Sequence, residues 1–250
     1  MKNIILVGSG NVATYLGIAL QNCNYNIVQV YSRSIENAKK LAQKLNTNFT
    51  NDLTQLKSTD LIIVSVNDDA ISTVLSKLKN TAIVHTSGSV RMDVFEPNFS
   101  DFGVFYPLQT FNKEIELAIS ETPFCIEGNS KAFEKELIEI AKNLSSNVIT
   151  MNSVQRRQLH IAAVFACNFS NHMYSIADDL LAKKNIDFSI LLPLIRRTVQ
   201  KLEANSPKEV QTGPAKRKDL QTIKNQINLL EDDDLRNIYK LITNQILKQK

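Results

Sequence analysis

A glycine-rich turn near the start of the chain limits the possible folds more than any other feature. Residues 4–7 are all apolar and predict a buried strand, and residues 11–20 have the pattern of a helix. The turn between them reads Gly-Ser-Gly, an arrangement that binds the pyrophosphate of a dinucleotide at a helix N-terminus. The contacts that this predicts come from the turn and the start of the helix: Gly8, Ser9, Gly10, Asn11 and Val12. A tight strand-to-helix turn without a ligand is the alternative.

The end of the second predicted strand indicates which dinucleotide the chain binds. Residues 26–31 run into Ser32-Arg33-Ser34, where an NAD-specific site has an acidic residue for the ribose 2′-hydroxyl. A guanidinium between two hydroxyls instead suits the 2′-phosphate of NADP as a charge-assisted partner. We therefore expect NADP as the cofactor, held here by Ser32, Arg33 and Ser34. The alternative is that Arg33 is an exposed loop cation and that the hydroxyls cap the helix expected at 35–45.

Strands and helices alternate through the first 150 residues. The predicted strands lie at 3–7, 26–32, 47–50, 61–66 and 82–85, and the predicted helices at 11–22, 35–45 and 69–78. Such alternation is typical of an α/β fold with a doubly wound, mainly parallel sheet of the Rossmann type. A further strand at 103–107 and a crossover unit at 124–150 extend this sheet.

Polar residues follow two neighbouring strands of the predicted sheet. Val66 ends one predicted strand and Asn67 follows it, and Thr86, Ser87 and Gly88 follow the next strand. Ligands of parallel sheets bind beyond the carboxyl ends of the strands, so we expect these residues to contact cofactor or substrate. Asn67 has a second explanation, because an Asn at this position can cap the helix that follows.

The pattern changes after Asn152. Residues 153–183 contain neither Gly nor Pro and predict one helix of about 45 Å, and further helices are expected at 188–204, 216–230 and 234–248. We therefore divide the chain into an NADP-binding Rossmann domain at 1–150 and an all-α substrate and dimerisation domain at 151–250. Apolar residues occupy more of the long helix than one stripe, so a second copy of the chain is expected to cover it in a homodimer.

Three polar residues of the C-terminal half are candidates for catalysis: His160, Asn168 and Arg217. His160 and Asn168 lie along one slowly turning face of the long helix, because they are separated by a multiple of four residues. A His side chain, with an ordinary pKa of about 6.5, suits proton donation to a carbonyl or imine as hydride arrives. The alternatives are a core histidine for His160 and a bridge to a neighbouring helix for Asn168. Arg217 follows a Gly-Pro turn, where it offers a clamp for an anion.

Composition limits where such a chain works and what it binds. The 250 residues carry a net charge of +4 without a basic stripe interleaved with aromatic residues, which argues against a nucleic-acid partner. No stretch approaches the length of a membrane span and no secretory leader precedes the first strand, so we expect a cytoplasmic protein without a membrane partner. Cys23, Cys125 and Cys167 are scattered without metal-ligand spacing, and we expect no metal site.

Several motifs together carry a resemblance to a known family. They are Gly-Ser-Gly-Asn-Val-Ala at 8–13, Ser-Arg-Ser at 32–34, His-Thr-Ser-Gly at 85–88, Tyr-Pro-Leu-Gln-Thr-Phe at 106–111, the run 160–168 and Thr-Gly-Pro-Ala-Lys-Arg-Lys-Asp at 212–219. The chain resembles bacterial NADP oxidoreductase proteins in which a Rossmann domain precedes a helical domain of unassigned function. This resemblance covers nearly the whole chain. It is also the reason to expect a functional role for the segment around Arg217.

The resemblance implies kinship with three groups of enzymes: pyrroline-5-carboxylate reductase, deazaflavin-dependent NADP oxidoreductases, and 6-phosphogluconate or β-hydroxyacid dehydrogenases. It also implies that the helical domain, similar to the C-terminal domain of 6-phosphogluconate dehydrogenase, pairs two subunits. One departure matters, because the β-hydroxyacid enzymes use a Lys on the long helix and residues 153–183 contain no Lys before the last position. Their acid–base mechanism therefore does not transfer to this chain.

The sequence favours an NADP(H)-dependent reductase or dehydrogenase. Such an enzyme would move a hydride to or from a small C=O, C–OH or C=N substrate, anionic substrates included, that is bound between the domains. The alternative is a protein that binds or senses NADP(H) without turnover, because no acid–base residue is assigned by the sequence alone.

Overall fold

The computed structural model describes residues 2–78, 81–95, 99–112 and 119–249. Contacts divide the chain into two compact units, Met1–His172 and Met173–Lys250. The strands described in the first unit are β1 Asn3–Val7, β2 Asn26–Tyr31, β3 Asn48–Thr50, β4 Leu61–Val64, β5 Ile83–His85, β6 Phe102–Pro107, β7 Phe124–Gly128 and β8 Val148–Thr150. Its α-helices are α1 Asn11–Asn22, α2 Ile35–Lys44, α3 Asp68–Leu75, α4 Lys131–Leu144 and α5 Ser153–Ala163.

The strands form one sheet in the order β3-β2-β1-β4-β5-β6-β7-β8. Strands β3 to β6 are parallel, β7 is antiparallel to β6, and β8 is parallel to β7 across the α4 crossover. The order reverses direction at β1, so the carboxyl ends of β1 and β4 flank a crevice of the kind in which dinucleotides bind. The predicted α/β class, with a doubly wound and mainly parallel sheet, is confirmed.

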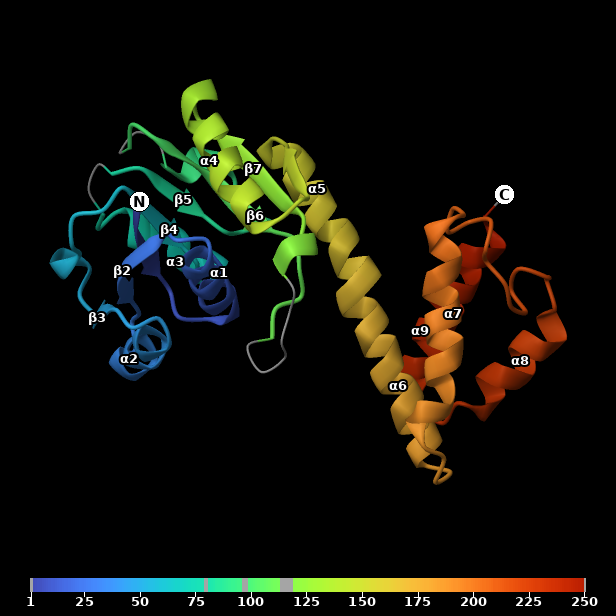
Figure 1. Ribbon diagram of the computed structural model, residues 1–250. Helices are drawn as coiled ribbons and strands as arrows, with labels where there is room; N and C mark the ends of the chain where they lie inside the picture. Colours follow the sequence, from blue (N-terminus) through green and yellow to red (C-terminus); the bar gives the residue numbers. More distant parts are fainter. Residues whose placement is uncertain (1, 79–80, 96–98, 113–118, 250) are drawn as a thin grey trace. The chain divides into compact units, whose positions relative to one another are not determined.

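Helices cover both faces of this sheet (Figure 1), which explains the uninterrupted apolar runs of its central strands. On one face, Ile4 and Leu6 of β1 pack against α1, α2 and α4. On the other face, Ile5 and Val7 pack against α3 and the segment around Phe95. Alternate residues of one strand therefore enter two different cores, and all four are fully buried.

The long helix predicted for residues 153–183 is present but is not uniformly α-helical. It consists of α5, a π-helical segment at Val164–Phe169 and α6 Ser170–Ala182. The boundary between the compact units falls inside α6, later than the change from strands to helices at residue 150. This difference has a physical cause, because the first turns of α5 are bound to the sheet.

A buried ion pair makes that attachment. The Arg156 side chain is fully buried, and its guanidinium binds the carboxylate of Glu127 on β7. It also donates to the backbone carbonyl of Val90 and to the hydroxyl of Ser153. The same hydroxyl donates to Glu127 and accepts from the backbone N–H of Met92. The start of α5 is thus fixed to β7 and to the segment after β5.

The second unit contains α7 Leu192–Gln200, α8 Leu220–Leu229 and α9 Asp233–Leu247 besides most of α6. The sequence predicted that the helix expected at 216–230 begins at residue 216, and this is wrong, because α8 begins at Leu220. Residues 213–218 form turns, with Gly213 and Lys218 at positive φ, and Asp219 caps α8 by accepting the backbone N–H of Thr222. Across both units, no described helix is both long and apolar enough to cross a membrane.

Candidate functional site

The turn after β1 is built as a dinucleotide-binding turn requires. Gly8 has a φ of 126°, a conformation that disfavours side chains, and a Cβ there would overlap the backbone carbonyl of Ser65. The chain itself therefore demands glycine at this position. The turn delivers the chain into α1, whose N-cap residue is Gly10.

Gly10 is different, because nothing in the chain requires a glycine there. Its φ of −78° suits any residue, and no atom lies within 4 Å of the place a Cβ would take. Gly10 is exposed at the N-terminus of α1, where backbone N–H groups favour an anion. The missing side chain leaves room for a ligand to approach the backbone closely at this position.

A cleft of about 380 Å³ opens beside this turn. One wall carries the Ser32-Arg33-Ser34 segment at the end of β2, and the other carries Val66 and Asn67 after β4. The lining residues that do not belong to these segments are Gly8, Ser9, Gly10, Tyr31, Asn37, Leu53, Ser65, Ala70, Thr73, Val74 and Lys77. The predicted cofactor residues at 8–10, after β2 and after β4 thus share one cleft, whose lining carries no carboxylate. Asn11, Val12 and residues 86–88 are not part of this lining.

The two serines of Ser32-Arg33-Ser34 are engaged differently. Ser34 caps α2, accepting the N–H of Asn37 and donating to the Glu36 carboxylate, so the capping alternative holds for this hydroxyl. Ser32 instead accepts a hydrogen bond of 2.8 Å from the hydroxyl of Ser9, which leaves its own hydrogen free to donate. Arg33 is exposed and belongs to no ion pair among the described residues.

Two other predicted cofactor residues have their side chains placed by the structure. Asn67 is the N-cap residue of α3, but its side chain makes no capping hydrogen bond and lines the cleft instead. Asn11 donates to the backbone carbonyl of Phe111 at 2.8 Å, and Tyr15 one turn later donates to that of Asn112. These bonds hold the segment after β6 against α1. Val12, partly buried, packs against the hydrophobic core.

The segment after β5 is buried and held by its own hydrogen bonds. Thr86 donates to Ser65, and Ser87 accepts the backbone N–H groups of Ser89 and Val90. His85, the last residue of β5, stacks on Phe95, and burial lowers its pKa to about 3, so it is neutral. Gly88, which was expected to contact cofactor or substrate together with Thr86 and Ser87, lies next to His160 of the long helix.

Gly88, Tyr106 and His160 meet at the carboxyl end of the sheet. The hydroxyl of Tyr106 on β6 lies 3.0 Å from Nδ1 of His160 on α5. A Cβ on Gly88 would lie 2.6 Å from that nitrogen and 2.8 Å from the Tyr106 ring, so only glycine leaves room for the pair. The structure therefore brings His160 next to the segment that follows β5.

Tyr106 was not among the predicted site residues. Burial raises the pKa of Tyr106 to about 12, so the phenol keeps its proton. A protonated phenol can donate to Nδ1 or accept from it, and it therefore holds the ring in either protonation state of His160. This contact leaves Nε2, on the other side of the ring, for proton exchange. The sequence signal for Tyr106 was its position at the end of a strand, shared with many core aromatics.

The remaining candidates lie elsewhere. Asn168 is exposed in the π-helical segment of the long helix, eight residues beyond His160. Arg217 is exposed in the turn before α8 and belongs to the second unit. Asp219, in the same segment, is occupied as a helix cap. Among the described residues, no three His, Cys, Asp or Glu side chains are grouped so as to hold a metal ion.

Comparison with known proteins places the chain in a family. Residues 3–87 match the family described as "NADP oxidoreductase coenzyme F420-dependent", and residues 122–246 match "Domain of unknown function (DUF2520)". The structure of a "putative NADP oxidoreductase" from Bacteroides fragilis is 42% identical, with a TM-score of 0.94 over 99% of this chain and 98% of that chain. The chain belongs to this NADP oxidoreductase family, with a DUF2520 region in its C-terminal half.

Two more distant relatives share the fold or part of the sequence with this chain. A 1-pyrroline-5-carboxylate reductase from Streptococcus pyogenes has the same fold, with 13% identity and a TM-score of 0.66 over 99% of both chains. Glutamyl-tRNA reductase from Saccharolobus islandicus is 29% identical over 148 residues, which are 59% of this chain. The chain spans only 30% of the length of that curated relative.

The contrast between Gly8 and Gly10 gives a test. Gly10→Ala should change the free energy of unfolding by no more than about 1 kcal/mol, the range of an N-cap change. It should weaken NADPH binding by about 1–3 kcal/mol, because the new methyl group overlaps a closely bound ligand. Urea denaturation and titration calorimetry measure the two effects. Gly8→Ala is the contrasting variant and should destabilise the fold itself. Unchanged NADPH affinity in Gly10→Ala would show that the turn holds no pyrophosphate.

Proposed function

We propose that this protein is an NADP(H)-dependent oxidoreductase that transfers a hydride to or from a small C=O, C–OH or C=N substrate. The observation that carries the proposal is the cleft beside Gly10, lined by Ser32 and Arg33 and by no carboxylate. Membership of an NADP oxidoreductase family supports it. Bound NADP(H) would supply or accept the hydride, and the chain's own residues hold the nucleotide and manage the proton.

Each part of the nucleotide has a matching surface. The N-terminus of α1 at Gly10, Asn11 and Val12 suits the pyrophosphate. Ser32 and Arg33 suit the 2′-phosphate as hydrogen-bond donors, and Ser34 contributes by fixing the segment as the cap of α2. Val66 and Asn67 lie after β4, on the way to the carboxyl ends of β5 and β6. A substrate would therefore meet the nicotinamide near Gly88.

His160 is proposed as the acid in reduction and the base in oxidation. When a hydride reaches the carbon of a C=O or C=N group, the π electrons move to the oxygen or nitrogen, which then takes a proton. Protonated His160 supplies it from Nε2 and becomes neutral imidazole, while Tyr106 keeps Nδ1 in place. Thr86 and Ser87 support Gly88 below this pair. Asn168 and Arg217 are proposed to orient the substrate, Arg217 by pairing with an anionic group.

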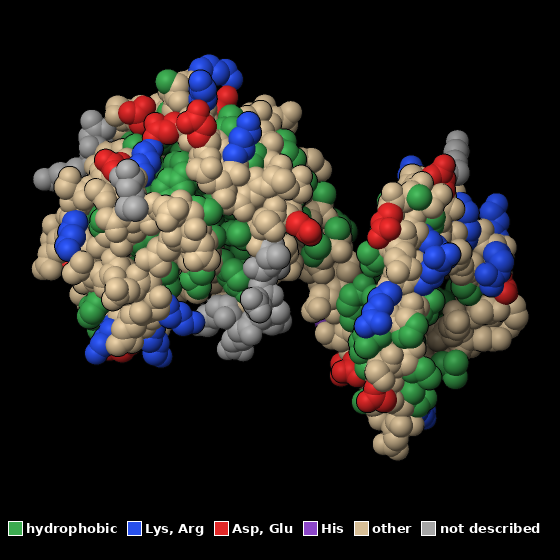
Figure 2. Space-filling view, in the orientation of Figure 1, with side chains coloured by type: hydrophobic (Ala, Val, Ile, Leu, Met, Phe, Trp, Pro, Cys, Tyr) green, Lys and Arg blue, Asp and Glu red, His purple; other side chains and the backbone are tan. Residues whose placement is uncertain are grey.

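A cytoplasmic homodimer is the form in which we propose that the protein works. Large apolar side chains of the long helix lie at the surface, with Phe165 65% and Ile161 52% exposed. In the second unit, Figure 2 shows hydrophobic side chains gathered on the surface between lysines and arginines. Apolar surface of this extent marks an interaction site, and a second copy of the chain carries the complementary apolar helix.

Nucleotide preference tests the cofactor assignment. Arg33→Ala should weaken NADPH binding by about 1.5–3 kcal/mol, the value of a hydrogen bond to a charged group, and should leave NADH binding nearly unchanged. Titration calorimetry with both nucleotides measures the difference. Equal losses for NADPH and NADH would refute the assignment of Arg33 to the 2′-phosphate.

Turnover tests the role of His160. Wild-type protein and NADPH are mixed with a library of small carbonyl and imine compounds, coenzyme F420 included because the family description names it, and absorbance at 340 nm is followed. With a compound that is reduced, His160→Ala should lower kcat about 10²- to 10⁴-fold and leave NADPH affinity intact. Tyr106→Phe should have a smaller effect, since His160 remains. Undiminished turnover in His160→Ala would remove it from the mechanism.

Molecular mass in solution tests the dimer. Light scattering at micromolar concentration should give twice the chain mass of 28.1 kDa. Phe165→Glu should shift the protein toward the monomer, because a carboxylate in an apolar interface lacks a partner. Ile18→Glu, which alters an exposed apolar residue of α1, is the matched control and should stay dimeric. A wild-type mass of 28.1 kDa would contradict the proposal.

A further inference from the structure

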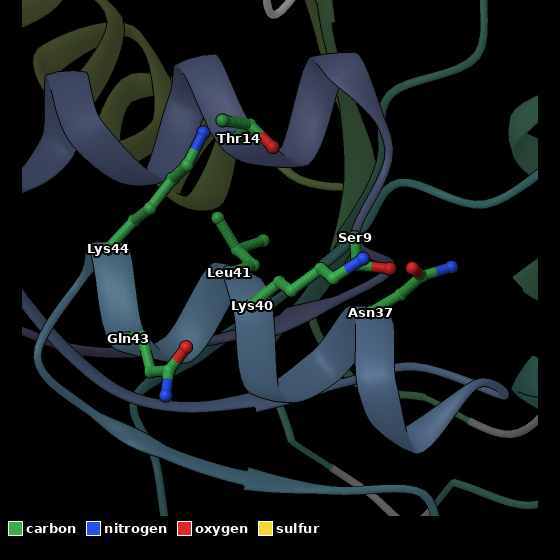
Figure 3. A pocket seen from close by; sticks show the side chains of 7 residues that line it. All are labelled: Ser9, Thr14, Asn37, Lys40, Leu41, Gln43 and Lys44. Atoms are coloured by element: carbon green, nitrogen blue, oxygen red, sulfur yellow. The ribbon is translucent and has the colours of Figure 1, made fainter.

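A second cleft, of about 570 Å³, lies between α1 and α2. Figure 3 shows the residues that line it: Ser9, Thr14, Asn37, Lys40, Leu41, Gln43 and Lys44. Ser9 and Asn37 also line the nucleotide cleft, so the two clefts meet at these side chains. A group bound at Ser32 and Arg33 is therefore adjacent to the entrance of the second cleft.

Lys40 is placed at this junction. Figure 3 shows its side chain reaching from α2 toward α1, with the amino group beside the side chains of Ser9 and Asn37. Lys44, one turn later, extends toward Thr14 at the other end of the cleft. Within the described parts of the chain, neither lysine forms an ion pair. The charge of Lys40 is thus directed at the point where the two clefts meet.

Charge balance explains why a second cation is needed there. A phosphate monoester carries about −1.5 to −2 charges at pH 7, and Arg33 supplies one positive charge. The hydroxyl of Ser34 is already occupied as the cap of α2, so it does not add a donor. Lys40 lines only the second cleft, but Figure 3 shows its amino group beside Ser9, whose hydroxyl is bonded to Ser32. Lys77, the lysine that lines the nucleotide cleft itself, follows α3 instead of belonging to α2.

The position of Lys40 also selects among the phosphates of the nucleotide. The pyrophosphate belongs at the N-terminus of α1, whereas the 2′-position of the adenosine ribose belongs at the end of β2. Lys40 comes from α2, the helix that follows β2, and lies beside Asn37 in the first turns of that helix. This location favours the 2′-phosphate over the pyrophosphate.

We infer that Lys40 is a second cation for the 2′-phosphate of NADP(H) and hence a determinant of the preference for NADP(H) over NAD(H). The inference rests on the proposed function, because it requires that NADP(H) binds in the cleft beside Gly10. Lys40 acts with Arg33, and the two cations bind the phosphate from α2 and from the segment after β2.

Binding measurements on the full-length protein test this inference. Lys40→Ala should weaken binding of NADPH and of adenosine 2′,5′-bisphosphate by about 5- to 20-fold at low salt, in line with an exposed charge-assisted contact. Binding of NADH and of adenosine 5′-monophosphate should change less than about twofold. The loss should shrink as salt is raised, because exposed charges are screened. Lys40→Arg should restore most of the affinity.

Lys39→Ala is the matched control, since Lys39 is an exposed lysine of the same helix that lines neither cleft. It should bind all four ligands as the wild type does. Equal losses for NADPH and NADH in Lys40→Ala would overturn the inference and place Lys40 at the pyrophosphate. A Lys40→Ala protein that binds like Lys39→Ala would also overturn it. If, in that case, Arg33→Ala still weakens NADPH binding and leaves NADH binding unchanged, the proposed function stands without Lys40. If the wild type binds no NADPH, the proposed function itself fails.

Discussion

The buried ion pair between Arg156 and Glu127 is the interaction on which the candidate site depends. It fixes the first turns of α5 to β7 and to the backbone of Val90, and His160 follows one turn later on the same helix. Removing one partner of a buried pair costs about 3–5 kcal/mol, a large part of the 5–15 kcal/mol that stabilises a typical domain. Such a cost ensures that the helix and the sheet stay together, and it keeps His160 within reach of Tyr106 and Gly88.

Some glycines and serines of the site are explained by the fold itself, and others are not. At Gly8 and Gly88 the surrounding atoms exclude a side chain, so packing alone accounts for the glycine. At Gly10 they do not, and the open space at this helix N-terminus is free for a group from outside the chain. The two serines differ in the same way. Ser32 accepts from Ser9 and keeps its own hydrogen available for donation, whereas Ser34 caps α2.

Much of this arrangement was predictable because it depends on local pattern. The alternation of apolar strands and amphipathic helices predicted the sheet, and the glycine turn with Ser32-Arg33 pointed to residues that line one cleft. Tyr106 was not predicted, since its importance comes from a contact with a residue 54 positions later in the chain. The late start of α8 was missed because Asp219 has two roles open to it in sequence, surface carboxylate or cap, and only the backbone decides between them. The predicted domain boundary at residue 150 marks the end of the strands, whereas the compact units divide inside α6, after the helix that Arg156 attaches to the sheet.

The π-helical segment at Val164–Phe169 changes the geometry of everything that follows it on the long helix. A regular helix has 3.6 residues per turn, so positions eight apart drift around its axis. The i→i+5 bonds of a π segment make a wider turn with more residues in it, which opposes that drift. The π-helical segment therefore reduces the angle around the helix axis that separates Asn168 from His160.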